Sequence, residues 1–399
     1  MKLVFLVDMN AFFISCETVR DPTLVVVPAA VAGDPERRSG IILTANYAAR
    51  ASGVKTTMTI YQAKALCPTM RLVPPDHAYY AACSYAVMTI LARYTPIVEQ
   101  NSIDEAWLDL AGCLPASTEP VALAKQIMAA IKQETGLDCS IGISKNKFLA
   151  KMAADMKKPR GITTLWPAEI ESKLWPLPVG DMYGVGRKMR EKLIDRGITT
   201  IGDLVRCGEQ TLAARYGKWG AELYAHARGY DPSSVTPHQK DEMKSIGRST
   251  TLASDVTDFE QAGKVLLALS ESVGERARRH HKKGTTVHLT IKYADFSVVT
   301  RQITLPATDM PMQIYTAACN LLRKHWNGRA VRLLGISLSG FAETGNRQLT
   351  FADMLGAPSS PSKQDERLEA AVGRIRAKYG NQKILRAALL EKKQKSTPF

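Results

Sequence analysis

The sequence contains no apolar run long enough to cross a membrane. A spanning helix needs about 20 largely apolar residues, and every apolar run in these 399 residues is shorter. The first residues are also unlike a secretory signal, because the apolar stretch ends at Asp8. We therefore expect a protein without a membrane association, in the cytoplasm.

The sequence also lacks paired cysteines. Its seven cysteines are odd in number and scattered, and none forms the short paired spacing that is typical of a zinc site. We expect free thiols that behave as small buried hydrophobes in a reducing compartment.

Acidic residues are in the minority. Against 53 lysines and arginines stand 38 aspartates and glutamates, so the formal net charge is +15. A surplus of this size attracts polyanions, because each neutralised phosphate releases counterions. The charge indicates a nucleic-acid ligand, with a generically basic protein as the alternative.

Strands and helices alternate over residues 1–165. The run Leu3-Val4-Phe5-Leu6-Val7 predicts a strand buried on both faces, and Asp8 stands at its end. Helical patterns lie at residues 9–19, 78–94, 121–134 and 146–156, and strands at 97–110 and 138–143. Between the first helix and Pro74-Pro75 the chain is small and irregular. The alternation indicates an α/β or α+β unit.

The remainder of the chain has two further regions and a tail. Residues 167–232 have an all-helical pattern punctuated by glycines, and residues 231–240 contain two prolines, which is typical of a linker. A β-α-β-β-α-β pattern occupies residues 244–339. The polar tail then predicts a helix over residues 365–378.

Three acidic residues occupy positions suited to metal binding. Asp8 ends the first predicted strand, and Asp104 and Glu105 lie in the predicted hairpin 97–110. Two-metal chemistry needs converging carboxylates that hold two cations about 3.5–4 Å apart, and pairing of the hairpin with the first strand would supply them. An isolated acidic pair in a turn is more often solvated surface charge. Here Ile103 and the run 106–108 are apolar, which is unusual for a solvated loop.

These acids lie in motifs that resemble those of the Y-family DNA polymerases, most nearly the bacterial DNA polymerase IV branch. The two catalytic motifs are residues 7–13 (VDMNAFF) and 102–106 (SIDEA). The resemblance continues in residues 44–50 (TANYAAR), 53–55 (GVK), 142–147 (GISKNK) and 151–159 (KMAADMKKP). It extends over about residues 1–340, and several ordered motifs are more specific than any one of them.

The resemblance implies an α+β multidomain fold, the right hand of a polymerase. Residues 1–12 and 76–166 would form the catalytic palm, and residues 13–75 small fingers. Residues 167–232 would form a helical thumb with a helix-hairpin-helix, joined by a linker at 233–243 to a β-α-β-β-α-β little finger at 244–342. Residues 343–399 would be a C-terminal tail.

The resemblance also implies a metal site. Asp8, Asp104 and Glu105 match the catalytic metal ligands, assisted by the backbone carbonyl of Met9. The implied cofactor is Mg²⁺, two ions per active site, for which Mn²⁺ can substitute. The family often has a second acid two residues after the first aspartate, and Asn10 stands there instead.

Further residues match the nucleotide-binding groups of the family. Phe13 matches the steric gate, an aromatic ring that leaves no room for a ribose 2′-OH, although a core phenylalanine beside Phe12 is the alternative. Tyr47, Arg50 and Lys158 match the groups that hold the incoming triphosphate, which suits a planar guanidinium fork and a compact ammonium.

Two bulky side chains match the roof over the nascent base pair. They are Ile41 and Leu43, and they are larger than the small residues that some family members have there. We expect this bulk to reduce tolerance of large lesions.

Two regions are candidates for holding duplex DNA. In the predicted thumb, Gly184 and Gly186 precede Arg187 and Lys188, so backbone N–H groups at a helix start would meet phosphates; an ordinary helical turn is the alternative. In the predicted little finger the candidate phosphate contacts are Lys244, Arg248, Lys292 and Arg301, although alternation does not say which face they occupy. Such contacts position DNA without a base code.

A short segment after the little finger is similar to a sliding-clamp-binding peptide. Gln348, Leu349 and Phe351 match its pattern, but the segment is one residue short. A sliding clamp is therefore one candidate partner, and a chance surface tetrapeptide is the alternative.

The combined prediction is a template-directed DNA polymerase for translesion synthesis and DNA repair. It would add dNTPs to a primer 3′-OH on primer-template DNA, as a nucleoid-associated monomer. The sequence shows no second acidic cluster for a 3′–5′ exonuclease, so we expect no proofreading. Together with the open site that the resemblance implies, this predicts low fidelity. Two rivals are a nucleotide cyclase, which has no need of duplex-holding regions, and a non-catalytic DNA-binding scaffold, which has no reason to keep the three acids and the triphosphate cations.

Overall fold

The computed structural model describes residues 2–34, 40–113, 119–237, 243–341, 363–380 and 383–389. The chain divides into two compact units, Met1–Gln239 and Lys240–Phe399. This division falls inside the predicted linker. No helix among the described residues is long and apolar enough to cross a membrane. All seven cysteines are free, but the expected burial holds only for Cys16, Cys67, Cys139 and Cys319; Cys83 and Cys207 are half-buried and Cys113 is exposed.

A five-stranded sheet forms the centre of the first unit. Its order is β5-β6-β1-β7-β8, and the strands are β1 (Val4–Met9), β5 (Val98–Gln100), β6 (Glu105–Asp109), β7 (Cys139–Ser144) and β8 (Ile162–Thr164). The central strand β1 pairs antiparallel with β6 and β7. All six of its residues are buried, which confirms the prediction of a strand covered on both faces.

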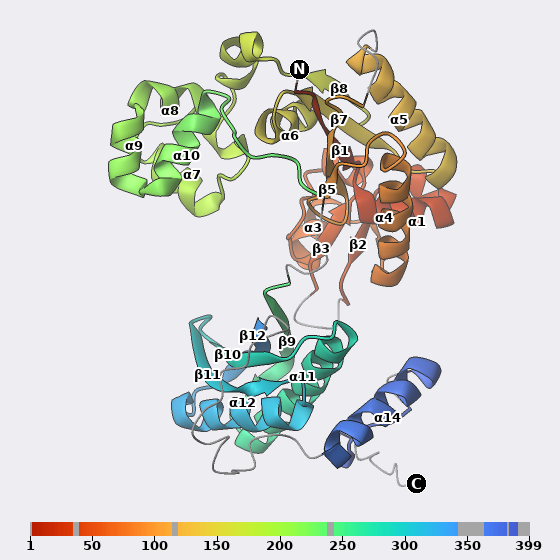
Figure 1. Cartoon of the computed structure of the whole chain (residues 1–399), viewed down its shortest axis with the longest axis vertical. Coiled ribbons are helices and arrows are strands. Elements are labelled where there is room, and N and C mark those ends of the chain that lie inside the picture. Colours follow the sequence, from red (N-terminus) through yellow and green to blue (C-terminus); the bar gives the residue numbers. More distant parts are fainter. Residues whose placement is uncertain are drawn as a thin grey trace. The chain divides into compact units, whose positions relative to one another are not determined.

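Helices cover the two faces of this sheet (Figure 1). On one face Phe5 and Val7 of β1 share a core with helices α4 (His77–Leu91) and α5 (Pro120–Thr135). On the other face Leu6 packs against helix α6 (Lys147–Met156). Because successive strand residues point to opposite faces, Asp8 shares the α6 face with Leu6.

Helix α6 lies unusually close to the sheet. A Cβ atom on Gly142 of β7 would stand 2.0 Å from the carbonyl oxygen of Ala150 and 2.3 Å from the amide nitrogen of Ala154. Glycine is therefore required for this packing. Asn146 caps the start of the helix, and its side chain accepts a hydrogen bond from the amide of Leu149.

A smaller three-stranded sheet stands beside the end of β1. Its order is β3-β2-β4, built from β2 (Ala29–Ala32), β3 (Ile42–Ala45) and β4 (Arg71–Val73). The helices of this region are α1 (Phe12–Arg20), α2 (Tyr47–Ala51) and α3 (Ile60–Leu66), with a 3₁₀ turn, η1 (Pro22–Val25). The sequence predicted only an irregular region here, because strands of three or four residues are too short to show alternation.

Residues 167–229 are helical, as predicted. Three short turns, η2 (Pro167–Glu169), η3 (Ile170–Leu174) and η4 (Val179–Asp181), precede the helices α7 (Arg187–Ile194), α8 (Ile201–Cys207), α9 (Glu209–Tyr216) and α10 (Lys218–Ala227). The chain then returns to the first sheet, where Val235 is buried with Leu6 and Trp107. Glu99 accepts a hydrogen bond from the amide of Thr236.

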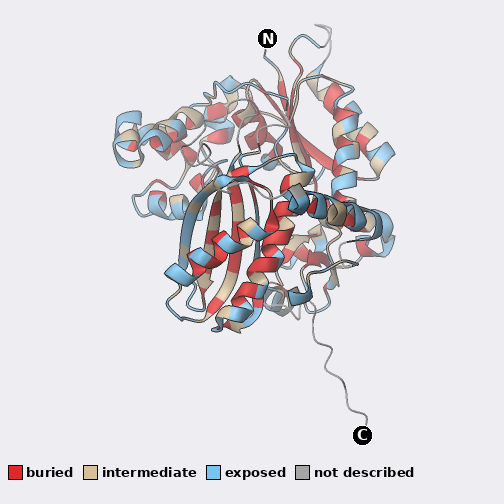
Figure 2. Ribbon diagram, turned by 60° about the horizontal axis from the view of Figure 1, so that its bottom comes forward, coloured by how far each residue is buried: buried red, intermediate tan, exposed pale blue. Residues whose placement is uncertain are grey.

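The second unit contains the predicted β-α-β-β-α-β order. The elements are β9 (Ser245–Val256), α11 (Phe259–Arg279), β10 (Gly284–Tyr293), β11 (Val298–Thr308), α12 (Pro311–His325) and β12 (Val331–Phe341). The antiparallel sheet has the order β11-β10-β12-β9. Both helices pack on one face of it and bury that face (Figure 2). A mixed α and β fold of several parts is thus confirmed.

The predicted C-terminal helix is present as α14 (Lys363–Tyr379), followed by a turn, η5 (Ala387–Leu389). Ion pairs hold it against α11: Arg376 Nη2 lies 2.8 Å from Glu271 Oε2, and Arg278 Nη2 lies 3.2 Å from Glu369 Oε2. The predicted clamp-binding segment lies outside the described residues.

Candidate active site

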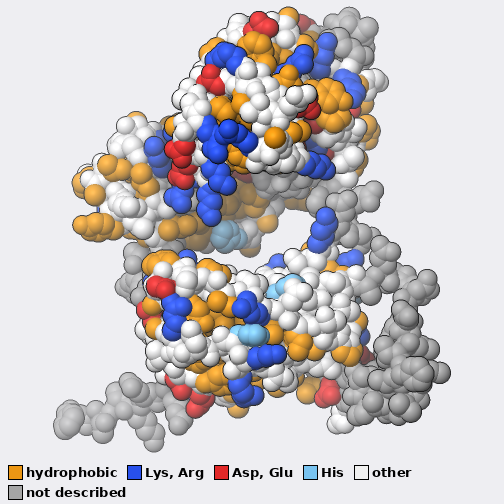
Figure 3. Space-filling model, turned by 90° about the vertical axis from the view of Figure 1, so that its left-hand side faces the viewer, with side chains coloured by type: hydrophobic (Ala, Val, Ile, Leu, Met, Phe, Trp, Pro, Cys, Tyr) orange, Lys and Arg blue, Asp and Glu red, His pale blue; other side chains and the backbone are white. Residues whose placement is uncertain are grey.

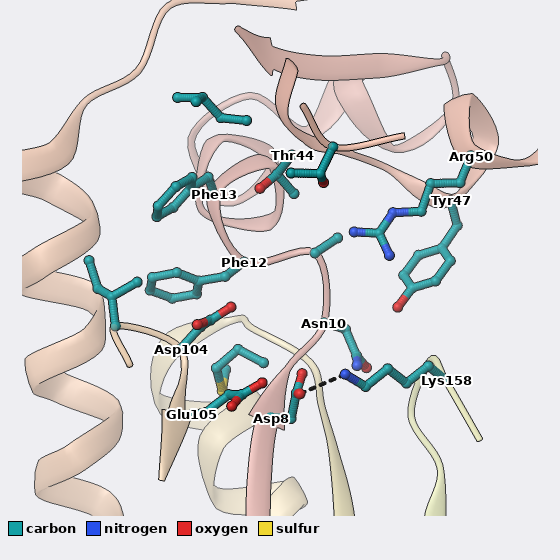
Figure 4. Close-up of a pocket in the computed structure, with 15 residues that line it drawn as sticks. Asp8, Asn10, Phe12, Phe13, Thr44, Tyr47, Arg50, Asp104, Glu105 and Lys158 are labelled. Atoms are coloured by element: carbon teal, nitrogen blue, oxygen red, sulfur yellow. Dashed lines mark hydrogen bonds and ion pairs between the residues drawn. The ribbon is translucent and has the colours of Figure 1, made fainter. Parts of the chain in front are cut away.

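A pocket of about 360 Å³ lies where β1 ends (Figure 4). It brings together residues from β1, the start of α1, β3, α2, the turn before β6 and the segment after α6. The lining residues are Asp8, Met9, Asn10, Ala11, Phe12, Phe13, Leu43, Thr44, Tyr47, Arg50, Thr56, Ile103, Asp104, Glu105 and Lys158.

The three predicted metal ligands all belong to the lining of this pocket. In the pairing of β1 with β6, Asp8 stands directly opposite Glu105. The amide of Met9 donates a 2.9 Å hydrogen bond to the carbonyl oxygen of Asp104, which ties the turn to the strand end. The predicted pairing of the hairpin with the first strand is therefore confirmed.

Two lysines neutralise these acids. Lys158 Nζ lies 2.6 Å from Asp8 Oδ2, and Lys151 Nζ lies 3.1 Å from the same oxygen. Lys151 Nζ is also 2.5 Å from Glu105 Oε1. Ser102 Oγ donates a 2.6 Å hydrogen bond to Asp104 Oδ1. Each of the three carboxylates thus has a partner from the protein.

The lysines and the burial of the site set the protonation of the acids. Burial raises the pKa of Asp8, but the hydrogen bond with Glu105 and the charges of Lys158 and Lys151 outweigh burial, so the pKa lies below its ordinary value. Burial, reinforced by the hydrogen bond with Asp8, raises the pKa of Glu105. For Lys151 the carboxylates of Asp8, Glu105 and Asp155 overcome the opposing effect of burial and raise the pKa.

The acids are a suitable donor set for a hard divalent cation. Mg²⁺ prefers carboxylate, carbonyl and water oxygens, and carboxylate oxygens are what Asp8, Asp104 and Glu105 present. In the described parts of the chain, however, no group of three or more acidic, histidine or cysteine side chains converges closely enough to hold a metal ion as it stands. Ammonium and hydroxyl groups hold these carboxylates in the structure.

Asn10 has a structural role beside the acids. It is 3 % exposed. Its Nδ2 donates to Ser140 Oγ at 2.9 Å, and its Oδ1 accepts a hydrogen bond from the amide of Arg160 at 2.8 Å. Asn10 therefore fastens the segment that carries Lys158 to the floor of the pocket.

Phe13 lines the pocket, whereas its neighbour Phe12 is 3 % exposed and belongs to the core. The ring of Phe13 stacks on Tyr80 with centroids 4.6 Å apart and planes at 17°. Tyr80 is fully buried and donates a 2.7 Å hydrogen bond to Glu17. The wall that Phe13 presents to the pocket is therefore rigidly supported.

Tyr47 and Arg50 reach into the pocket from α2 (Figure 4). The hydroxyl of Tyr47 is buried and has no hydrogen-bond partner among the described residues, and burial raises its pKa. The Nε of Arg50 donates a 2.8 Å hydrogen bond to the carbonyl oxygen of Ala45, which directs the rest of the guanidinium into the pocket. An unpartnered hydroxyl beside a guanidinium and the ammonium of Lys158 suits an anionic ligand.

The two predicted roof residues differ in position. Leu43 on β3 lines the pocket, but Ile41 does not belong to its lining. Ile41 forms an isolated bridge to Thr59 and is 36 % exposed.

The predicted thumb motif lies at an exposed helix start. Gly184 adopts φ +92°, and Gly186 precedes the first residue of α7, where an added Cβ would meet open space. The side chain of Arg187 is 85 % exposed. Gly184, Gly186, Arg187 and Lys188 are all exposed, so the start of α7 and two cations face solvent together.

The basic residues of the second unit lie on different faces of its sheet. Arg248 pairs with Ile336 and Arg301 with Leu289, both buried, so these arginines are on the helix-covered side. Arg248 accordingly donates a 2.8 Å hydrogen bond to Ser272 of α11. Lys292 alternates with the buried residues of β10 and faces the open side, and Lys244 is exposed.

Basic side chains are abundant on the face shown in Figure 3, over both units, as the net charge of +15 leads one to expect.

Sequence reasoning missed several side chains of the site. Thr44 and Thr56 line the pocket, and Lys151 lies beneath it. Thr44 and Lys151 lie in motifs that the resemblance had identified, yet neither received a role. For Thr56 the sequence offered no signal.

Family models match most of the chain. The impB/mucB/samB family matches residues 7–155, its C-terminal domain matches residues 243–351, and the IMS family HHH motif matches residues 167–198.

Several named proteins are similar over almost the whole chain. DNA polymerase IV of Clostridium kluyveri is 51 % identical over 395 residues, covering 98 % of this chain and 99 % of that protein. DNA polymerase IV of Alkaliphilus oremlandii is 50 % identical with the same coverage. DNA polymerase IV 1 of Bacillus subtilis is 40 % identical over 99 % of this chain and 95 % of its own length.

A solved structure has a similar fold. The Y-family DNA polymerase chimera Dbh-Dpo4(243-245)-Dbh matches with a TM-score of 0.75 and 26 % identity. The match covers 85 % of this chain and 99 % of the chimera.

Proposed function

The chain belongs to the impB/mucB/samB family of Y-family DNA polymerases, and from that membership we propose how its residues carry the reaction. It is a DNA-directed DNA polymerase of the low-fidelity, translesion kind. We propose that Asp8, Asp104, Glu105 and the carbonyl of Met9 hold two Mg²⁺ ions, for which Mn²⁺ can substitute. The reaction is attack of a primer 3′-OH on the α-phosphate of an incoming dNTP, with release of pyrophosphate.

One observation carries this assignment: Asp8 stands opposite Glu105 in the sheet, and Asp104 is tied to the same strand end by the amide of Met9. Strand ends are rigid, so the acids are held in place before substrate binds. When bound, the metal ions lower the pKa of the attacking hydroxyl and neutralise charge on the phosphates. The protein itself contributes positioning and a fixed field of charges.

The triphosphate would lie against Tyr47, Arg50 and Lys158. The hydroxyl of Tyr47 has no partner in the described protein and can donate to a phosphate oxygen. Lys158 now pairs with Asp8 and Asp155. A bound triphosphate offers it a third anion, so we propose that Lys158 exchanges Asp8 for phosphate when nucleotide and metal enter.

Phe13 would select the deoxy sugar. Its ring forms a pocket wall backed by the stacked ring of Tyr80, so it cannot retreat from an added 2′-OH. Leu43 would contact the nascent base pair from the roof. For Ile41, outside the pocket lining, a direct contact with the base pair has less support.

Primer-template DNA would be held through its phosphates. In the thumb the candidates are Gly184 and Gly186, the N–H groups at the start of α7, and the side chains of Arg187 and Lys188. In the second unit Lys244 is an exposed candidate, and Lys292 shares the helix-free side of the sheet. Arg248 has less support, because it is bonded to Ser272 on the other side.

Gln348, Leu349 and Phe351 suggest a sliding clamp as a partner, with a chance tetrapeptide as the alternative. We propose a monomer that acts in the cytoplasm at the nucleoid, where primer-template DNA is found.

Primer extension with Mg²⁺ and all four dNTPs tests the site. We expect the wild type to extend the primer and Asp104→Ala to lose at least about 10³-fold in kcat/KM, because a carboxylate aimed at transition-state charge is removed. Asp109→Asn, at the far end of the strand β6 that follows Asp104, is the matched control and should keep wild-type activity. Extension by Asp104→Ala at the wild-type rate would refute the site assignment. Formation of cyclic nucleotide by the wild type without extension would favour the cyclase instead.

A further inference from the structure

Lys151 is a buried cation that the proposed reaction does not use. It lies in the middle of α6 and is 8 % exposed. Its Nζ lies 3.1 Å from Asp8 Oδ2, 2.5 Å from Glu105 Oε1 and 3.3 Å from Asp155 Oδ2. A buried lysine is costly unless its charge is paired, so this arrangement requires a specific reason.

The side from which Lys151 approaches distinguishes it from Lys158. Lys158 belongs to the lining of the pocket and stands beside Asp8 in Figure 4, whereas Lys151 does not belong to that lining. Lys151 reaches the acids from α6, on the sheet face that Asp8 shares with Leu6. A triphosphate in the pocket can draw Lys158 away from Asp8, but it cannot reach Lys151 in the same way.

The packing of α6 keeps this lysine in place. Gly142 lets the helix backbone approach the sheet so closely that a Cβ atom there would overlap Ala150 and Ala154, the residue before Lys151 and the residue three positions after it. The neighbours Ala150, Met152 and Ala153 are also buried. Lys151 therefore has little room to swing toward solvent.

The charges of the site explain what Lys151 can do there. Asp8 and Glu105 stand opposite each other at a strand end, and two adjacent carboxylates repel when both are ionised, which a cation in contact with both offsets. Lys151 is the one of the two lysines that touches both. The same ammonium repels any divalent cation that enters from the pocket side.

We propose that Lys151 is a positioning residue, an internal counter-charge that holds Asp8 and Glu105 together before metal binds and that weakens their affinity for metal. This inference rests on the assignment of Asp8, Asp104 and Glu105 as metal ligands. It predicts that Lys151 keeps the metal-free site assembled at the cost of metal affinity. Metal binding then depends on a nucleotide, which brings its own phosphate oxygens as ligands.

Titration with Mn²⁺ alone tests the inference, with bound ion followed by electron paramagnetic resonance in the full chain without DNA or nucleotide. The variants are Lys151→Met and Lys151→Gln, two neutral side chains of similar length. A unit charge within about 4–6 Å moves a carboxylate pKa by about 1–3 units, and a doubly charged ion responds in the same direction. We expect both variants to bind Mn²⁺ at least about tenfold more tightly than the wild type.

Thermal unfolding supplies a second and independent readout. In EDTA, Lys151→Met should unfold at a lower temperature than the wild type, and the gap should narrow at saturating Mn²⁺, because tighter binding stabilises the variant more. If Lys151 contributed only to packing, the difference in unfolding temperature between Lys151→Met and the wild type would be the same with and without Mn²⁺. The matched control is Lys147→Met, which neutralises a lysine one turn earlier that pairs with Glu99 at 2.8 Å, and its Mn²⁺ affinity should equal that of the wild type.

Unchanged or weaker Mn²⁺ binding by both Lys151 variants would overturn the proposal. Asp104→Asn distinguishes this failure from failure of the metal-site assignment. If the wild type binds Mn²⁺ and Asp104→Asn weakens that binding, the site stands whatever the Lys151 variants do. If the wild type binds no Mn²⁺, or Asp104→Asn binds it as well as the wild type, the assignment fails and the role of Lys151 fails with it.

Discussion

Gly142 on β7 controls how close helix α6 can come to the catalytic strand. In Gly142→Ala the new Cβ would lie 2.0 Å from the carbonyl oxygen of Ala150. A carbon and an oxygen rarely approach closer than about 3.3 Å, so helix and sheet must separate by about 1.3 Å. The obstructing atoms belong to the backbone, so no side-chain rotation relieves the overlap.

Overpacking of this kind costs about 1–3 kcal/mol and occasionally more, and the backbone clash puts Gly142→Ala at or above the upper end. For a unit of this size, each kcal/mol lowers the unfolding temperature by about 2–4 °C. We therefore expect the N-terminal unit to unfold about 6–12 °C earlier. Primer extension should also fall, because the shift carries Lys151 away from Asp8, which is now 3.1 Å distant.

Differential scanning calorimetry measures the stability, and primer extension measures the function. Gly373→Ala in helix α14 is the matched control, since a Cβ there meets no atom within 4 Å, and alanine should stabilise the helix slightly. A Gly142→Ala protein that unfolds within about 1 °C of the wild type and keeps its activity would refute the argument that this contact places α6.

Two further outcomes are expected. Phe13→Ala should lower the preference for dNTP over rNTP, measured as the ratio of kcat/KM values, by about 5- to 150-fold, because it removes about 1–3 kcal/mol of crowding against a 2′-OH. The control Phe12→Leu, in the core, should leave this ratio unchanged. An unaltered ratio in Phe13→Ala would count against the role of Phe13 as the steric gate. His226 stacks on Phe148 with centroids 4.5 Å apart, and burial lowers its pKa. As the pH falls through about 6.5, the unfolded chain therefore binds more protons than the folded chain, which destabilises the fold. Between pH 7.5 and 5.5 the unfolding temperature should fall less in His226→Gln than in the wild type. An equal fall in both proteins would contradict this.

The larger elements were predictable because their patterns are strong. The continuous apolar run before Asp8 predicted a buried central strand, and β1 is buried throughout. Six elements of the second unit follow the predicted order. The meeting of Asp8 with Glu105 was predictable from the pairing of the hairpin with the first strand, because Asp8 ends one apolar run and Glu105 precedes another.

The small sheet of β2, β3 and β4 was not predictable from periodicity. Its strands have four, four and three residues, and the four residues of β2 are all buried, so they show no alternation. Such a strand is defined by its partners, which lie up to about 40 residues away along the chain. The pocket wall that Leu43 and Thr44 supply therefore became visible only with the tertiary structure.

Lys151 shows why the site itself exceeds what a pattern can predict. The usual expectation for a lysine within a helix is an exposed face, yet seven consecutive residues of α6, from Phe148 to Ala154, are buried. Burial of the ammonium is tolerable only because Asp8 and Glu105 arrive from strands 143 and 46 positions away. That pairing requires Gly142, two strands in register and a helix packed closely onto them, and each of these depends on residues far apart in the sequence. The local sequence around Lys151 therefore does not predict the pairing, because the carboxylates that neutralise the lysine come from the assembled sheet.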